Sequence, residues 1–239
     1  MEVEDRSVFE LAIVQPTRTD TYGNSSEQVI DFYLPEKVSK PLIVLIHGGF
    51  WRPEYDRKHL SHFAEALANV GWPVALIEYR RIIGNPDAMV QDVFTAIAKL
   101  TEDFDSIILV GHSAGGHIAL LAGNKFPAIG IIALAPITDL VQAEELDLDE
   151  GAVSDFLGVP AKMRSDLDPW NLPALAMKVL LIHGSADIRV PIGFSRAYVE
   201  KTAIESTNLL ELQGVGHFEL IDPRSAIFSQ ICRELTALI

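Results

Sequence analysis

A serine lies in a glycine-rich turn between a strand-like run and a helix-like run. The turn is Gly111-His112-Ser113-Ala114-Gly115-Gly116, which follows apolar residues 106–110 and precedes residues 117–122. In this G-x-S-x-G pattern, glycines let strand and helix pass close together while the serine hydroxyl points outward. Ser113 is therefore the candidate nucleophile. The alternative interpretation is that the glycines and the serine simply end a buried strand.

A second glycine-containing loop could stabilise the charge that a serine nucleophile creates. The apolar run 42–46 leads into His47-Gly48-Gly49-Phe50-Trp51. Backbone N–H groups of such a loop can bind the oxyanion that forms during acyl transfer. We expect an oxyanion hole built from the N–H groups of Gly49, Phe50 and Ala114, with His47 bracing the loop through hydrogen bonds.

A serine hydroxyl also needs a base, and the base needs a carboxylate to orient it. Asp187 follows the strand-like run 178–183, and His217 lies in a glycine-flanked loop after the run 207–212. The chain order serine, acid, histidine fits loops at the carboxyl ends of parallel strands. We therefore predict Asp187 as the acid and His217 as the base. Asp187 could instead cap the helix that Val190-Pro191 begins, or form an Asx turn.

The same order argues against other side chains. His217 is the only histidine after Asp187. Three aspartates either precede the last parallel strands or follow His217: Asp139, Asp168 and Asp222. Three histidines are expected on a helix surface or at a strand end: His59, His62 and His183.

Aromatic and imidazole side chains beside these motifs are candidate substrate contacts. Trp51 could stack on an aryl substrate at the mouth of the site, or it could pack the loop against the rim of the sheet. His112 and His117 flank the nucleophile. They could contact a ligand or fill tightly packed space beneath the turn.

The elements that must position these residues follow an α/β pattern. From Pro41 onward, short apolar runs alternate with helical periods, which predicts a mostly parallel sheet with helices on both faces. Residues 7–15 and 27–34 flank the turn-forming cluster 21–26, so we predict an antiparallel N-terminal hairpin and eight strands in all. The expected parallel strands are 41–46, 73–79, 106–110, 129–135, 178–183 and 207–212, and the expected helices include 57–70, 86–100 and 222–238.

The length of 239 residues fits one α/β domain, and we predict that residues 1–239 form a single unit. One irregular, acidic stretch, 137–176, lies within it. This stretch is either a small lid insertion beside the site or a solvated connection with two short helices.

Composition restricts the function classes. A net charge of −14 argues against nucleic acid or an anionic membrane surface as a partner. No apolar run is long enough to span a membrane, and the acidic start does not predict a secretory signal, so we expect a cytoplasmic protein. The lone Cys232 rules out an intrachain disulfide. No metal-ligand spacing and no phosphate-binding lysine motif is present, so we expect no metal and no cofactor. The sequence leaves both a monomer and a homodimer as alternatives.

The motifs together resemble those of esterases with the α/β-hydrolase fold, over most of the chain from about residue 29. The stretches Val29-Ile30-Asp31-Phe32-Tyr33-Leu34-Pro35, Glu78-Tyr79-Arg80 and Ala135-Pro136-Ile137-Thr138-Asp139-Leu140 are similar to recurrent segments of that family. The pair His47–Trp51 and Gly111–His117 is similar to the motifs of kynurenine formamidases. Esterases of the hormone-sensitive-lipase type usually carry a third glycine at the position of Phe50 and an aspartate at that of His112.

This resemblance implies a serine hydrolase that cleaves a small ester or an aryl formamide through an acyl-enzyme. It makes a kynurenine formamidase, which converts N-formylkynurenine to kynurenine and formate, the first candidate. A broad short-chain carboxylesterase is the alternative. From another class, a non-catalytic ligand-binding protein could use the same scaffold.

Overall fold

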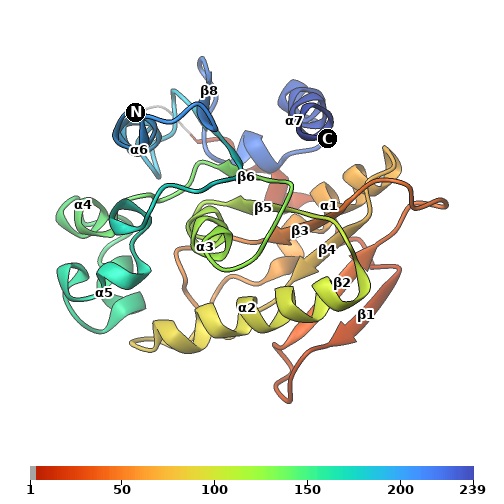
Figure 1. The fold of residues 1–239 in the computed structure, drawn as a ribbon, viewed down its shortest axis with the longest axis horizontal. Helices are drawn as coiled ribbons and strands as arrows, with labels where there is room; N and C mark the ends of the chain where they lie inside the picture. Colours follow the sequence, from red (N-terminus) through yellow and green to blue (C-terminus); the bar gives the residue numbers. More distant parts are fainter. Residues whose placement is uncertain (1–3) are drawn as a thin grey trace.

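The central strands of the sheet are apolar on both faces, and helices cover each face. The computed structural model describes residues 4–239 and contains one eight-stranded sheet in the order β1-β2-β4-β3-β5-β6-β7-β8 (Figure 1). Strands β1 and β2 are antiparallel to their neighbours, and the remaining pairs are parallel. The strands are β1 Arg18–Thr21, β2 Val29–Tyr33, β3 Leu42–Ile46, β4 Val74–Ile77, β5 Ile107–His112, β6 Gly130–Leu134, β7 Lys178–Gly184 and β8 Thr207–Leu212.

Helices follow the strands in the alternating pattern that the sequence predicts. The α-helices are α1 Ser61–Asn69, α2 Pro86–Asp103, α3 Ala114–Gly123, α4 Leu140–Glu145, α5 Ala152–Leu157, α6 Gly193–Thr202 and α7 Ala226–Leu238. Short 3-10 turns are η1 Ser7–Glu10, η2 Arg57–Leu60, η3 Ala161–Met163, η4 Ser165–Leu167, η5 Pro169–Asn171 and η6 Phe218–Ile221. The predicted mostly parallel eight-stranded sheet with an antiparallel N-terminal hairpin is confirmed.

Successive side chains of each central strand point to opposite faces of the sheet, so the protein has two hydrophobic cores. On β3, Val44 and Ile46 face the core beneath α2, α3 and α6, whereas Ile43 and Leu45 face the core beneath α1 and α7. All four side chains are fully buried. Because both faces are covered, such strands have continuous apolar sequences, which is the pattern from which they were predicted.

The prediction for the first strand is wrong. Residues 7–15 do not pair in the sheet; they begin with η1, and the hairpin partner of β2 is β1 at residues 18–21. Strand β1 reads Arg-Thr-Asp-Thr and is exposed because it lies at the edge of the sheet, so it carries no apolar alternation. The apolar side chains of residues 7–15 serve a different contact, since Val8 is buried in the core beneath α1 and α7.

The irregular stretch 137–176 consists of short helical elements, part of which pack against the core. It contains the two short helices α4 and α5 and the turns η3, η4 and η5. Leu140, Val153 and Phe156 of this stretch are at most 2% exposed and join the core beneath α2 and α3, whereas Leu146 and Met163 are exposed.

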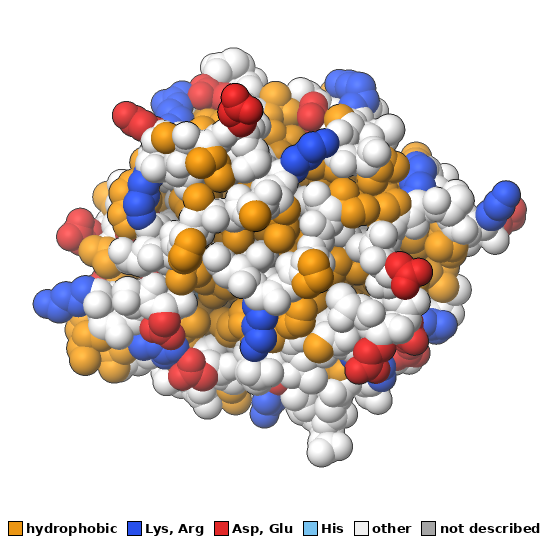
Figure 2. Space-filling view, in the orientation of Figure 1, with side chains coloured by type: hydrophobic (Ala, Val, Ile, Leu, Met, Phe, Trp, Pro, Cys, Tyr) orange, Lys and Arg blue, Asp and Glu red, His pale blue; other side chains and the backbone are white. Residues whose placement is uncertain are grey.

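Figure 2 shows the face over α2 and α3, on which apolar side chains lie scattered between charged ones. Within residues 4–239, no helix combines the length and the apolar character that crossing a membrane requires.

Candidate active site

Ser113 lies on a strained turn between β5 and α3. Its backbone has φ 56° and ψ −121°, a conformation that costs free energy for a residue with a side chain. A Cβ atom added to Gly111 would lie 2.2 Å from the carbonyl oxygen of Gly115, and one added to Gly115 would lie 2.1 Å from that of Ile46. Only glycine fits these contacts, so the two glycines allow the sharp turn that presents the serine.

His217 and Asp187 lie together at the carboxyl ends of β8 and β7. The distance from His217 Nδ1 to Asp187 Oδ2 is 2.6 Å, and both side chains are at most 2% exposed. Asp187 Oδ1 accepts hydrogen bonds from the backbone N–H groups of Arg189 and Val190. Asp187 therefore does not cap α6, whose N-cap is Ile192 without a side-chain hydrogen bond; one carboxylate oxygen closes an Asx turn, while the other faces the imidazole.

Hydrogen bonds keep the Asp187 carboxylate ionised. Burial by itself would raise its pKa, but hydrogen bonds with His183 and His217 and the Val190 N–H hold the pKa well below its usual range. His183 Nε2 lies 2.8 Å from the Val190 carbonyl oxygen and 3.3 Å from Asp187 Oδ2, and its Nδ1 lies 2.7 Å from Ser195 Oγ. His183 thus helps to position the Asp187 carboxylate, a role that its expected place at a strand end did not indicate.

The nucleophile and the base face a common cavity, which we call the Ser113 cavity. It leaves about 30 Å³ in which the centre of a water molecule can move. No hydrogen bond joins the Ser113 hydroxyl to His217 within residues 4–239, and such bonds often tighten only when substrate binds. The cavity is lined by Arg6, Phe9, Gly49, Phe50, Tyr55, His59, His112, Ser113, Asp149, Arg189, His217 and Phe218.

The loop after β3 presents free backbone donors to this cavity. Gly49, Phe50 and Trp51 all have positive φ, at 110°, 49° and 57°. In the described part of the chain, no hydrogen bond uses the N–H groups of Gly49, Phe50 or Ala114. A Cβ on Gly48 would lie 2.9 Å from the Cβ of Ser113, so the loop passes directly against the turn. This arrangement has the donors that an oxyanion requires.

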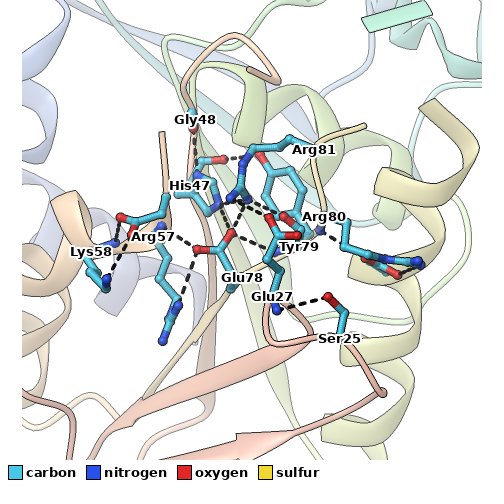
Figure 3. A network of polar contacts seen from close by, with 12 residues as sticks. Ser25, Glu27, His47, Gly48, Arg57, Lys58, Glu78, Tyr79, Arg80 and Arg81 are labelled. Carbon is cyan, nitrogen blue, oxygen red and sulfur yellow. Dashed lines mark hydrogen bonds and ion pairs between the residues drawn. The ribbon is translucent and has the colours of Figure 1, made fainter. Parts of the chain in front are cut away.

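A buried polar network holds the base of the loop (Figure 3). His47 Nε2 lies 3.1 Å from Glu78 Oε1, and its ring stacks on Tyr79 with centroids 4.4 Å apart. The Tyr79 hydroxyl donates to the His47 carbonyl oxygen at 2.9 Å. These contacts match the expectation that His47 braces the loop.

Glu78 is the centre of that network. It accepts hydrogen bonds from Arg57 and Arg81, and Arg57 also pairs with Asp31. Burial would raise the pKa of Glu78, but the charge and hydrogen bond of His47 and the charge of Arg81 keep it well below its usual range. A buried carboxylate with several donors is a rigid support, and the Glu-Tyr-Arg stretch is the sequence signal that could have located it.

His112 contacts His217, the predicted base. Its Nε2 donates to the His217 carbonyl oxygen at 3.1 Å, and the two rings lie 4.5 Å apart. Burial and the neighbouring His217 hold the pKa of His112 well below its usual value, so the ring is neutral. His112 also lines the Ser113 cavity, as a substrate contact must.

The structure places the Trp51 side chain in the interior, as in the packing alternative, and not at the mouth of the site. Its side chain is 1% exposed, stacks on Phe156 with centroids 4.5 Å apart, and meets His117 edge to face. It does not line the Ser113 cavity, whereas the adjacent Phe50 does. The partner Phe156 comes from the irregular stretch 137–176, a contact that local sequence cannot reveal.

Two buried polar groups fasten that stretch beside the turn. His117 Nε2 donates to the Leu167 carbonyl oxygen at 2.7 Å. Asp168, with 0% exposure, accepts from the backbone N–H groups of Leu140 and Trp170. Burial raises the pKa of Asp168 to about 6. Asp168 thus holds backbone in place, as its position before the last parallel strands predicts, and His117 takes the packing role that was one of its two alternatives.

His59 lies in the 3-10 helix η2, which agrees with the expected helical position. It also lines the Ser113 cavity and meets the His47 ring edge to face, which was not expected. Burial and the neighbouring His47 lower its pKa to about 4. No group of three or more His, Cys, Asp or Glu side chains within residues 4–239 is arranged to hold a metal ion.

The chain is similar in sequence to proteins of known class. The family model BD-FAE matches residues 30–128. The chain is 28% identical to Esterase LipC of Mycobacterium tuberculosis, over 84% of this chain and 59% of that protein. It is 27% identical to the kynurenine formamidase of Salmo salar, over 84% of this chain and 74% of that protein. The chain therefore spans less than two thirds of the mycobacterial relative.

Solved structures give the same fold. The crystal structure of esterase B from Lactobacillus rhamnosis superposes with a TM-score of 0.79 at 20% identity, covering 98% of this chain and 90% of that one. This likeness and the strand order confirm the predicted α/β-hydrolase fold.

Proposed function

We propose that this α/β-hydrolase is a serine esterase that cleaves small esters through an acyl-enzyme, with Ser113, His217 and Asp187 as its triad. The observation that carries the proposal is the 2.6 Å contact between His217 and Asp187, beside the positive-φ turn that presents Ser113. The relatives named as esterases support the same class.

Each side chain has a role in two half-reactions. His217 Nε2 takes the Ser113 proton as Oγ bonds to the substrate carbonyl carbon. The N–H groups of Gly49, Phe50 and Ala114 stabilise the oxyanion. The bond to the leaving group then breaks, and the leaving group receives the proton from His217. Water, deprotonated by His217, repeats these steps and releases the acid and free Ser113.

We infer short acyl groups, from formyl to butyryl, on an aromatic leaving group. The free space in the Ser113 cavity is small, about 30 Å³ for the centre of a water molecule, and Phe50 lies beside the oxyanion donors. Phe9, Tyr55 and Phe218 offer aromatic surfaces for a leaving group. Deformylation of N-formylkynurenine is the finer proposal, supported by the formamidase relative at 27% identity.

Steady-state rates test these proposals together. We expect kcat/KM to fall gradually along a series of p-nitrophenyl esters from C2 to C12, because each methylene changes binding by roughly 1–3 kcal/mol. A maximum at C8 or longer would contradict the short-acyl cavity. N-formylkynurenine should be cleaved in the same assay. Good ester turnover without deformylation would discard only the formamidase proposal.

A further inference from the structure

We propose that the N-terminal segment, residues 4–14, forms a wall of the substrate site and that Arg6 binds a carboxylate on the leaving group. The proposal rests on the serine esterase activity proposed above and names a substrate class for it. Preferred substrates would be short-acyl esters or amides whose aromatic leaving group is anionic.

The N-terminal segment is fixed against the active-site loops along its length. Glu4 pairs with Arg189, two residues after Asp187, at 2.9 Å. Val8 is 3% exposed and packs in the core. Farther along, the Val14 N–H donates to Ser61 Oγ at 3.2 Å. With contacts at both ends and in the middle, the segment holds Arg6 and Phe9 in place over the cavity.

Arg6 is directed to the cavity by two aromatic rings. Its guanidinium carbon lies 5.3 Å from the centroid of Phe9 and 5.4 Å from that of Phe218. The Phe218 centroid lies 5.1 Å from the His217 ring. Phe218 therefore contacts both the cation and the ring of the base. Aromatic contacts orient a guanidinium without using its N–H donors, which stay available for a carboxylate.

Charge balance singles out Arg6 among the cations near the cavity. Arg189 pairs with Glu4 and approaches Asp149 at 3.6 Å. Arg52 pairs with Asp149 at 3.1 Å and with Asp155 at 3.0 Å. Asp149, the acid that lines the cavity, is thus neutralised.

Among residues 4–239, the contacts of the Arg6 guanidinium are the two aromatic rings and include no ion pair, and the adjacent Asp5 accepts a hydrogen bond from the Ser7 N–H. On a protein of net charge −14, an arginine that lines the Ser113 cavity and has no ion pair within residues 4–239 is a specific feature that favours an anionic ligand.

A matched pair of substrates isolates the charge. We would measure kcat/KM for 4-acetoxybenzoate and for its neutral analogue 4-acetoxybenzamide, using the full chain and the variants Arg6→Gln and Arg6→Lys. Arg233→Gln is the control. Arg233 is an exposed arginine of α7, whose last turn lies at the start of β7 near Lys178, away from the site.

We expect the unaltered protein to prefer the benzoate. Arg6→Gln should lower kcat/KM about tenfold for the benzoate and less than twofold for the benzamide, as expected for one charge-assisted hydrogen bond at a partly exposed site. Arg6→Lys should restore part of the loss. High salt should reduce the preference in the unaltered protein. Arg233→Gln should leave both rates within twofold.

Other outcomes separate this inference from the activity on which it rests. Equal losses for both substrates in Arg6→Gln would mean that Arg6 only holds the wall, and no loss would remove Arg6 from binding; either result overturns the inference while the esterase activity stands. Failure of the unaltered protein to cleave either ester would refute the activity itself, and the inference with it.

Discussion

Replacing Asp187 with asparagine should remove almost all activity, and the structure explains why so conservative a change matters. Asp187 Oδ1 accepts from the N–H groups of Arg189 and Val190 at 2.8 and 2.9 Å. In Asp187→Asn those donors retain the amide oxygen, so the amide NH₂ group faces His217. An NH₂ group cannot accept a hydrogen bond, and it donates to His217 Nδ1 instead.

This reversal moves the imidazole proton to Nε2, the nitrogen that must accept the Ser113 proton. By analogy with the serine-protease triad, the fall in kcat should be about 10⁴-fold, which corresponds to a barrier roughly 5 kcal/mol higher. The melting temperature should change little, because size and most hydrogen bonds are kept.

The assay is hydrolysis of p-nitrophenyl acetate, with Asp222→Asn as the matched control. Asp222 is also a hydrogen-bonded aspartate of low exposure, but its carboxylate contacts Arg224 rather than His217. We expect Asp222→Asn to keep activity within about twofold. A large loss in Asp222→Asn with a small loss in Asp187→Asn would refute the acid assignment.

Three further variants test the supports of the site. Gly115→Ala should destabilise the fold by roughly 1–3 kcal/mol or more and lower esterase activity, because its Cβ would lie 2.1 Å from a backbone oxygen. Gly193→Ala is the control, since no atom lies within 4 Å of its added Cβ, and it should leave stability and activity unchanged. Urea unfolding compares the stability of the two variants. Trp51→Phe should lower the melting temperature yet leave KM for aryl esters unchanged, since the ring is buried; a raised KM with unchanged stability would contradict this. The raised pKa of Asp168, about 6, means that the folded state binds a proton more tightly than the unfolded chain. The Asp168 contribution to stability therefore falls between about pH 4 and pH 6, and the stability of the unaltered protein relative to Asp168→Asn should decrease by on the order of 2 kcal/mol from pH 4 to pH 7; urea unfolding that shows the same difference at both pH values would disprove it.

Local sequence predicts those parts of the fold in which the residue type is set by the immediate structural surroundings. Central strands such as β3 are apolar on both faces because helices cover both, so their sequence reveals their place. Gly111 and Gly115 mark the turn because no other residue fits beside backbone atoms. The order of Ser113, Asp187 and His217 follows from the positions of their strands, which the apolar pattern located.

Features that depend on distant partners were not predictable in this way. Edge strand β1 has polar residues and no pattern to detect, whereas Val8 of the apolar segment before it packs in the core beneath α1 and α7. Trp51 is buried because Phe156, about a hundred positions along the chain, stacks on it. Arg6 reaches the Ser113 cavity only because the chain before β1 folds back over the loops after β7 and β8.

Labelling with a fluorophosphonate, followed by mass spectrometry of the intact protein and its peptides, tests the central claim most directly. A serine activated by His217 attacks phosphorus, whereas an unactivated serine hydroxyl reacts far more slowly. We predict one adduct per chain, on Ser113, and no adduct in Ser113→Ala at unchanged melting temperature. An unlabelled protein, or equal labelling of Ser113→Ala, would contradict the account and favour a binding protein on a hydrolase scaffold.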